Sequence, residues 1–449
     1  MSAMTRVRQP VGELWALLGA LGVLVMISAG ETGAGARPFN PPSIDPVGVL
    51  APLVRAAGLD WSPPLLRSAA VIGGLLVAVG AIVLAIRNRP WPRWAAVALT
   101  LVVVLLLTVP GVALQAGLRQ ATAPWFHTND STFQIEIAGQ LIRDGQNPYG
   151  HDYSHSGMER FYTFDDTEAT QVNGRQVALD HFAYFPGTPL SAAAWGLLPQ
   201  PFSDYRFLVL LCSLATGACA LLFRGPLGWK LALGALLAAS PLAIRADWFG
   251  QGDAPALLCL VLAFALITRR RWVWAAVAIA VAVLLKQFAL FALPFVALAI
   301  WRRADRADAV RAACAFAALL AAGFLPFVIM DFGALWQDTI AYGGSTYPII
   351  GYGLAPLLVK AGLLQIHGAW PFGLLALLVW LPVTLLLLRA QVRSGRLWTA
   401  AACFAASIYV LFFISRVFQE TYVIWPLTAI VVAALVAIHE REEPVAGVG

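Results

Sequence analysis

Long apolar runs separated by short basic turns dominate this chain and limit what it can fold into. The runs are unbroken over roughly 14 to 22 residues, whereas the strands of a membrane barrel alternate apolar and polar residues. Only 12% of the 449 residues are Asp, Glu, Lys or Arg, about half the usual share in soluble domains. At roughly 20 residues per crossing, the apolar content accommodates about twelve helices, with a range of about eleven to thirteen. The sequence therefore predicts an all-α polytopic membrane protein.

Basic residues between the runs orient the predicted helices. Arg6 and Arg8 precede the first run, and the arginine-rich turns at 269–271, 302–311 and 389–396 fall on the same side when the runs alternate. By the positive-inside rule, this side and both chain ends are cytoplasmic, and we expect a multi-pass protein of the plasma (inner) membrane. The first run also fits a signal peptide. The predicted spans are residues 11–29, 68–86, 94–114, 205–223, 231–244, 254–268, 272–285, 288–301, 309–330, 372–388, 397–414 and 422–438.

This alternation divides the chain into three parts. They are an N-terminal transmembrane hairpin with an external loop (1–93), a core with a long external loop at 115–187 (94–330), and C-terminal helices with an external loop at 331–371 (331–449). The short apolar stretches 189–198 and 354–364 are bounded by Pro or Gly, so we expect re-entrant or interfacial helices on the outer side.

The polar residues that could carry chemistry concentrate in the external loop 115–187. Most predicted spans have no ionisable residue near their middle, which is unusual for ion-coupled transporters and pumps. The loop, in contrast, contains nine acidic residues and four histidines. A loop of this length in a membrane protein is more often functional than a simple spacer.

Asp130 stands at the start of a predicted amphipathic helix in this loop. The apolar residues Ile135, Ala138 and Ile142 recur at helical spacing, and Gly145 ends the pattern. Asp130 could be a helix N-cap, because Asn or Asp at that position satisfies unpaired amides. It could also be a catalytic carboxylate held at the membrane surface by a helix lying in the interface.

Four short motifs, taken in order, resemble those of GT-C superfamily glycosyltransferases. The chain is most similar to the polyprenyl-phosphate-mannose-dependent mannosyltransferases of actinobacteria (glycosyltransferase family 87-like), over residues 94 to 449. The motifs are Asp130 and Phe133 with Ala138, Gly139 and the segment 145–149 (Gly-Gln-Asn-Pro-Tyr); 184–190 (Tyr-Phe-Pro-Gly-Thr-Pro-Leu); 248–253 (Trp-Phe-Gly-Gln-Gly-Asp); and 284–288 (Leu-Leu-Lys-Gln-Phe) with Leu293 and Pro294.

This resemblance implies a GT-C-like core, a lipid-phosphate sugar donor, an external acceptor and an acidic base in the first external loop. Asp130 matches the base, and a carboxylate within hydrogen-bond reach can take the proton of an acceptor hydroxyl. The chain departs from the family because its long loop follows the third predicted span and not the first. Glu31, after the first span, is therefore a rival, but no interfacial helix follows it.

Three cations at the outer ends of predicted spans are candidates to bind the donor phosphate. Lys286 is the strongest, because an ammonium between two short apolar helices needs an anion or water. Arg416 lies in a compact polar run between two spans. Arg245 and Arg416 could instead simply extend to the membrane interface, as long basic side chains often do.

Other polar and aromatic side chains could contact the sugar or the acceptor, although turn residues, surface histidines and interfacial aromatics explain many of them equally well. No third and fourth ligands accompany the pair His151 and His155 at a metal-site spacing, so no metal or other cofactor is expected. The predicted sugar or acceptor contacts are Gln251, Asp253, Tyr149, His181, Tyr184 and His127.

The sequence therefore predicts an inverting membrane glycosyltransferase. It would move a sugar, with mannose as the expected one, from a polyprenyl-phosphate donor to an extracytoplasmic glycolipid or polysaccharide acceptor. We also expect it to contact membrane lipids, and we expect no nucleic-acid partner. Two alternatives remain, a transporter or lipid-carrier flippase and a non-catalytic scaffold of the cell envelope. No residue distinguishes between sugars, linkages or acceptors.

Overall fold

Most of the described residues are helical. The computed structural model describes residues 11–28, 31, 48–57, 63–87, 92–121, 128–162, 171–172 and 175–442. The α-helices of the first half are α1 (Val11–Ser28), α2 (Ala51–Ala57), α3 (Pro63–Arg87), α4 (Arg93–Ala121), α5 (Asp130–Arg143), α6 (Gly187–Trp195), α7 (Tyr205–Ala218), α8 (Leu227–Ala239) and α9 (Pro241–Phe249). Those of the second half are α10 (Ala254–Thr268), α11 (Trp272–Leu285), α12 (Leu293–Arg303), α13 (Arg306–Trp336), α14 (Leu354–Lys360), α15 (Phe372–Leu375), α16 (Leu381–Ser394), α17 (Trp398–Ile414) and α18 (Ile424–Arg441).

Short helical turns and strands complete the described chain. Two-residue strands pair β1 (Gln171–Val172) with β2 (Arg175–Gln176) in antiparallel fashion, and β3 (Ile350–Gly351) with β4 (Val417–Phe418) in parallel. Two π-helical segments follow α13 and α15, at Gln337–Thr346 and Ala376–Trp380. The 3-10 segments are Tyr153–His155, Met158–Tyr162, Val177–Leu179, Cys219–Leu222, Gln287–Ala292 and Glu420–Val423.

Every predicted apolar run is mostly helical over its described residues. Two runs are interrupted, because Ser240 separates α8 from α9 and a 3-10 segment precedes α12. Helix α4 continues to Ala121, so the first residues of the predicted loop 115–187 are two further turns of this helix. Both predicted short outer helices are present as α6 and α14. In α13 the backbone breaks at Asp331, directly after the predicted end of that span.

Five described helices are long and apolar enough to cross a membrane, and the bent pair α8 and α9 could form a sixth span. The five are Arg93–Gln120, Tyr205–Leu222, Arg306–Tyr342, Phe372–Ser394 and Glu420–Arg441. Further apolar helices, such as α10, α11 and α17, are shorter. The described part of the chain is thus an all-α membrane protein, and the number of twelve crossings stays a prediction.

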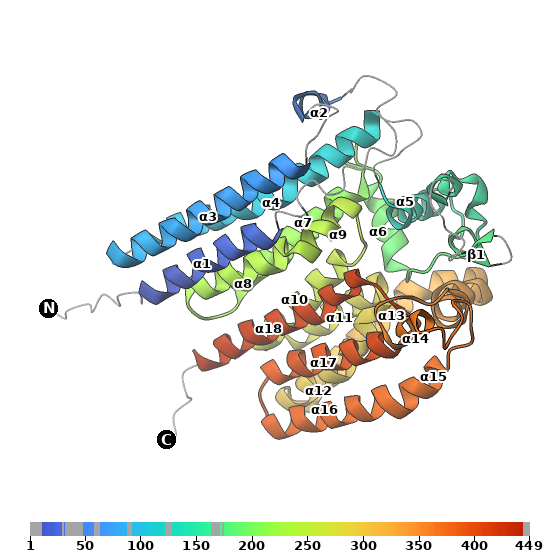
Figure 1. Ribbon diagram of the computed structural model, residues 1–449. Helices are drawn as coiled ribbons and strands as arrows, with labels where there is room; N and C mark the ends of the chain where they lie inside the picture. Colours follow the sequence, from blue (N-terminus) through green and yellow to red (C-terminus); the bar gives the residue numbers. More distant parts are fainter. Residues whose placement is uncertain are drawn as a thin grey trace.

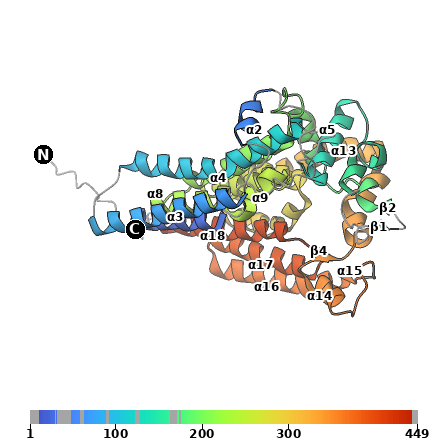
Figure 2. The same ribbon diagram turned by 45° about the horizontal axis from the view of Figure 1, so that its top comes forward.

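The two ends of the helix bundle differ in composition. Figure 1 shows the start of α1 and the end of α18 at one end, and α5, α6 and β1 at the other. Arginine-rich turns gather at the first end, where Arg303 donates to the backbone oxygen of Gly395 and to Glu440 of α18. Figure 2 shows α5, β1, β2 and β4 together at the opposite end. We call this second end the outer end.

Apolar side chains fill the centre of the bundle. The largest buried cluster joins α10, α11, α17 and α18, with Trp425, Phe264 and Phe404 almost inaccessible to solvent. A second cluster joins α1, α4 and α8, and a third surrounds α5 at the outer end. Small residues allow the helices of a membrane protein to pack closely against one another. Gly217 of α7, for example, contacts the backbone of Gly234 in α8.

Candidate functional site at the outer end

Helix α5 begins with a cap that leaves Asp130 inside the first turn. The side chain of Asn129 accepts a hydrogen bond of 2.8 Å from the backbone N–H of Thr132, so Asn129 and not Asp130 is the N-cap residue. Asp130 is partly buried and accepts from the N–H of Ser131. The alternative interpretation of Asp130 as the N-cap is therefore wrong, because the preceding residue fills that position.

The predicted motifs pack around α5. Gly139 meets the backbone of Ala192 and Ala193, so a β-carbon there would approach their backbone atoms to 2.7 Å. Thr132 donates to the carbonyl oxygen of Phe249 over 2.6 Å. Gly250 has a positive φ of 80° and a β-carbon there would lie 2.6 Å from the Thr132 hydroxyl. Two physical factors thus favour glycine at position 250, namely the backbone conformation and the close approach of α5.

Lys286 lies directly after α11, where another motif docks. Thr188 donates to the carbonyl oxygen of Leu285, which holds the start of α6 against the end of α11. The ammonium of Lys286 is 3.4 Å from a carboxylate oxygen of Asp253 and 4.7 Å from the ring centroid of Tyr184. Lys286 and Asp253 are both buried. The anion that Lys286 requires is thus present in the protein, and among the described residues its ammonium has no hydrogen-bonded acceptor.

Arg416 is held by the loop that precedes α14. Its Nε donates to the carbonyl oxygen of Tyr347 over 2.9 Å, and its backbone oxygen accepts from Ile350. Arg416 is only 6% exposed, and burial lowers the pKa of its guanidinium. No carboxylate among the described residues pairs with it. Arg416 is consequently a buried cation rather than one that extends freely to the interface.

Two tyrosines connect Asp130 with these cations. Burial raises the pKa of Tyr184, and the carboxylates of Asp253 and Asp130 raise it further. Burial also raises the pKa of Tyr347, again with a contribution from Asp130. Asp130 therefore acts electrostatically on both phenols. Lys286 lies over the ring of Tyr184, and Arg416 donates to the backbone oxygen of Tyr347, so these two tyrosines link the surroundings of the three predicted residues.

Arg245 and Gln251 have different surroundings from Lys286 and Arg416. Arg245 forms an ion pair with Glu420, and its guanidinium lies over the ring of Phe249 at 5.6 Å. This internal partner explains the position of Arg245 without a bound phosphate. Gln251 belongs to the turn after α9, and its backbone N–H donates to Ala246. Its side chain is partly buried and has no hydrogen-bond partner among the described residues.

Tyr149 and His181 support the loop from inside. The hydroxyl of Tyr149, which is 3% exposed, donates to the carbonyl oxygen of Tyr184. His181 Nδ1 lies 3.0 Å from Asp338, whose carboxylate also accepts from the N–H groups of Gly150 and Phe182. Asp338 therefore joins the predicted loop 115–187 to the segment after α13. Sequence reasoning missed Asp338, because its partners are about 150 to 190 residues away in the chain.

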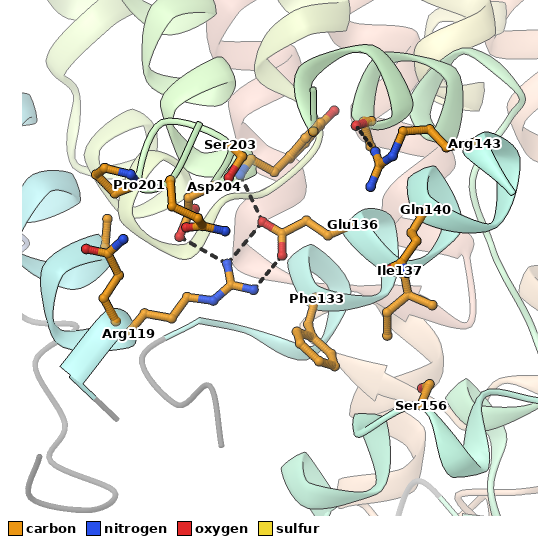
Figure 3. A pocket seen from close by; sticks show the side chains of 16 residues that line it. Arg119, Phe133, Glu136, Ile137, Gln140, Arg143, Ser156, Pro201, Ser203 and Asp204 are labelled. Carbon is orange, nitrogen blue, oxygen red and sulfur yellow. Dashed lines mark hydrogen bonds and ion pairs between the residues drawn. The ribbon is translucent and has the colours of Figure 1, made fainter. Parts of the chain in front are cut away.

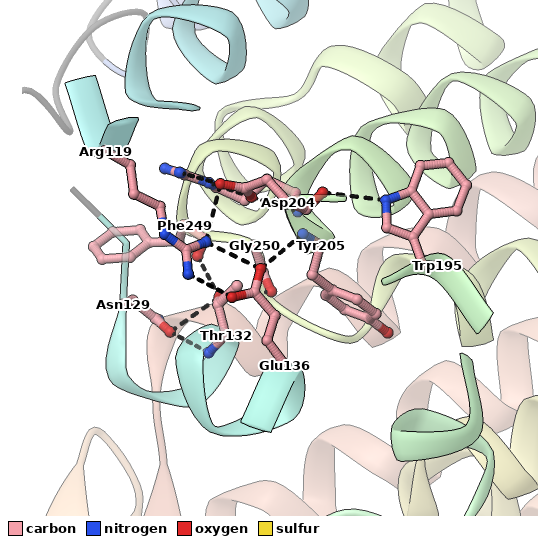
Figure 4. A network of polar contacts seen from close by, with 10 residues as sticks. Arg119, Asn129, Thr132, Glu136, Trp195, Asp204, Tyr205, Phe249 and Gly250 are labelled. Atoms are coloured by element: carbon pink, nitrogen blue, oxygen red, sulfur yellow. Dashed lines mark hydrogen bonds and ion pairs between the residues drawn. The ribbon is translucent and has the colours of Figure 1, made fainter. Parts of the chain in front are cut away.

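A buried network of four charges lies on another side of α5 (Figure 4). Arg119 at the end of α4 pairs with Glu136 and with Asp204, each at 3.0 Å from one guanidinium nitrogen. Asp204 also accepts two side-chain hydrogen bonds from Arg206, which is fully buried. Burial alone would raise the pKa of Asp204, but Arg206 and Arg119 hold it well below its usual value. The network fixes α4, α5 and α7 to one another. In the sequence, only charged residues at the ends of apolar runs indicated that such a network could form.

A cavity of about 360 Å³ adjoins this network (Figure 3). It is bounded by the end of α4, the exposed side of α5 and the connection between α6 and α7. Asp130, Lys286 and Arg416 do not line it. The lining residues are Ala116, Arg119, Gln120, Phe133, Glu136, Ile137, Gln140, Arg143, Ser156, Ala192, Gly196, Gln200, Pro201, Ser203, Asp204 and Tyr205.

One predicted sugar or acceptor contact, His127, lies outside the described residues. Comparisons of this chain with protein-family profiles, with curated proteins and with solved structures find no match.

Proposed function

We propose that this chain is a membrane glycosyltransferase that uses a polyprenyl-phosphate sugar, with mannose as the expected sugar. The observation that supports the proposal most is that Lys286 lies over the ring of Tyr184 and Arg416 donates to the backbone oxygen of Tyr347, while the carboxylate of Asp130 contributes to the raised pKa of both tyrosines. A carboxylate and two buried cations at one end of a membrane bundle suit a reaction between an uncharged acceptor and a lipid phosphate. The sequence motifs that resemble the GT-C superfamily surround the same residues.

In the proposed reaction, Asp130 accepts the proton of an acceptor hydroxyl. The hydroxyl oxygen forms a bond to the anomeric carbon on the face opposite the phosphate, the anomeric C–O bond to phosphate breaks, and the configuration inverts. Polyprenyl phosphate leaves as an anion, and it needs charge stabilisation more than a proton. Lys286 and Arg416 supply that charge. The proposed acceptor is an extracytoplasmic glycolipid or glycan, and Gln251 and Asp253 are the proposed contacts to the sugar.

Lys286 has a divided role in this proposal. Its distance of 3.4 Å to Asp253 is longer than the 2.7–2.9 Å of a direct charge-assisted hydrogen bond. The ammonium therefore has donors to offer to a phosphate, while Asp253 offsets part of the cost of burying it. Asp253 also accepts from the indole N–H of Trp425 over 2.8 Å, so the carboxylate is itself held in place.

Substitution of Asp130 tests the proposed function directly. Asp130→Asn should lower transfer from a radiolabelled polyprenyl-phosphate mannose in membranes by about 100-fold or more, since general-base catalysis typically contributes about 10²–10⁴. Asp144→Asn, at the exposed other end of α5, is the matched control and should transfer at the wild-type rate. Near-normal turnover by a well-expressed Asp130→Asn variant would remove Asp130 from the mechanism.

The two cations predict a separate kinetic effect. Lys286→Gln and Arg416→Gln should raise the KM for the lipid donor, because each removes a charge from the leaving-group side. Lys360→Gln, an exposed lysine at the end of α14, should leave the KM unchanged. An unchanged donor KM in both site variants would contradict phosphate binding here.

One observation favours the transporter alternative. Asp247 is fully buried in α9 and accepts from Ser213 near the middle of α7, while its other carboxylate oxygen has no partner among the described residues. The helix pair α8 and α9 is bent by 40°, and broken helices with buried carboxylates occur in transporters. Transport of a lipid-linked sugar across the membrane of proteoliposomes, without glycosyl transfer, would favour this alternative. Asp247→Asn should then abolish the transport.

A further inference from the structure

The cavity beside the four-charge network contains polar groups that the protein itself does not use. The side-chain oxygen of Gln120 is buried and has no partner, and the side chains of Gln140, Gln200 and Ser203 make no hydrogen bond to any described residue. Buried polar groups are nearly always satisfied by protein, water or ligand. The buried oxygen of Gln120 therefore indicates a hydrogen-bonding ligand, and the more exposed side chains of Gln140, Gln200 and Ser203 offer it further partners around the same cavity.

The charges of the cavity indicate a neutral ligand. The charged residues that line the cavity are two cations and two anions: Arg119 pairs with Glu136 and Asp204, and Arg143 donates to the backbone oxygen of Ala193. A phosphate or carboxylate would meet the carboxylate of Glu136. A carbohydrate, in contrast, offers hydroxyls that both donate and accept, which matches amides, a serine and a carboxylate. Phe133 adds an aromatic face to the same wall.

The rim of the cavity is apolar. The segment between α6 and α7 contributes Gln200 and Ser203 to the lining, while Leu197, Leu198 and Phe202 of the same segment are exposed by 75%, 41% and 45%. In a chain whose helices lie in a bilayer, exposed apolar side chains of this kind face lipid. A ligand in the cavity would therefore have its polar part in the protein and an apolar part beside it.

We propose that this cavity binds the neutral carbohydrate head of an amphipathic acceptor, with the apolar tail against Leu197, Leu198 and Phe202. The volume of about 360 Å³ is within the range of small-molecule sites. Phe133 lies one helical turn from Asp130 on α5, a rise of about 5 Å, so a sugar chain in the cavity can extend toward the proposed base. The role of this ligand as acceptor rests on the proposed glycosyl transfer, whereas its binding does not.

Photolabelling of the full chain in phospholipid nanodiscs tests the site. The probe is octyl α-D-mannopyranoside with a diazirine at the end of its alkyl chain, followed by peptide mapping. We expect label on the segment 196–205, and competition by excess methyl α-D-mannopyranoside. The double variant Gln140→Ala, Gln200→Ala should weaken labelling by about tenfold or more through two lost hydrogen-bonding amides. Both side chains are exposed and unpaired, so the fold should be kept.

Two controls separate the possible outcomes. Gln365→Ala, an exposed glutamine in the second external loop, should label like the wild type. A diazirine-bearing octanol without the sugar should label the segment weakly and without competition by the mannoside. Equal labelling by that probe, or unchanged labelling of the double variant, would overturn carbohydrate binding in the cavity.

Asp130→Asn distinguishes failure of this site from failure of the proposed function. The variant should keep the labelling while it loses transfer. Labelling without any Asp130-dependent transfer would support the carbohydrate site and count against glycosyl transfer. Transfer that depends on Asp130 but no labelling would leave the proposed function and overturn the cavity as the acceptor site.

Discussion

Breaking the buried four-charge network should destabilise the protein more than breaking an exposed ion pair of the same chemistry. Asp204 is 4% exposed and accepts from Arg206 Nε at 2.8 Å, Arg206 Nη2 at 2.6 Å and Arg119 Nη1 at 3.0 Å. In Asp204→Asn the neutral amide cannot balance the charges of Arg119 and Arg206, and the fully buried Arg206 loses its ion pair with Asp204. Loss of one partner of a buried ion pair typically costs about 3–5 kcal/mol.

This cost corresponds to an unfolding equilibrium constant raised by about two to three and a half orders of magnitude. The matched control is Asp308→Asn, whose partner Arg311 has a side chain exposed by 67%. Exposed pairs contribute about 1 kcal/mol or less. Denaturant titration of the purified chains in mixed micelles measures both free energies of unfolding. Equal losses in the two variants would refute the view that burial of the network decides its strength.

The network also predicts a pH dependence with a definite sign. The arginines lower the pKa of Asp204 in the folded state below its unfolded value of about 3.9. Its contribution to stability is therefore fully present above about pH 4 and is lost as the pH falls through the lower folded pKa. The difference in stability between wild type and Asp204→Asn should be constant from about pH 5 to 8. A difference that shrinks within that window would contradict the lowered pKa.

Two further predictions concern the outer end. Gly250→Ala should cost clearly more stability than Gly395→Ala, because both glycines have positive φ (80° and 66°) but only Gly250 has close neighbours. Gly395→Ala should cost about 1 kcal/mol from backbone strain alone, and similar losses in titrations of the two variants would argue against the close approach of Thr132. Asp338→Ala should cost about 1–3 kcal/mol and speed limited proteolysis of residues 150–182, since it leaves the N–H groups of Gly150 and Phe182 without their acceptor; unchanged proteolysis would show that Asp338 does not hold this loop.

The positions of the helices could be read from the chain because each depends on a local pattern. The apolar runs at 205–223 and 422–438 are helices α7 and α18, with the start and end of each within a few residues. The amphipathic pattern after Asn129 and its end at Gly145 likewise correspond to α5. In lipid, backbone groups must be satisfied within the helix, so hydrophobicity and helix bounds go together. The lengths of α8 and α12 were harder to predict, because their breaks depend on packing and not on composition.

The candidate site was predictable only in part. Asp130, Lys286 and Arg416 were expected from their types and places in the chain, and the structure brings them near Tyr184 and Tyr347. Tyr347 itself was not expected, because nothing in its local sequence distinguishes it from other interfacial aromatics. Arg245 was expected beside them, yet Glu420 pairs with it. A partner on a distant helix cannot be read from a local pattern.

The sequence alone determined that this chain is an all-α membrane protein, which segments are helical, and that nine of its 24 acidic residues and four of its six histidines lie in one loop. Those properties follow from hydrophobicity and periodicity, which act over a few neighbouring residues. Only the tertiary structure decided that Asn129 caps α5, that Asp253 stands beside Lys286, and that Asp338 ties the predicted loop 115–187 to the segment after α13. Ion pairs and hydrogen bonds act over a few ångströms in space between residues far apart in the chain, so the packing of the helices decides which of them form.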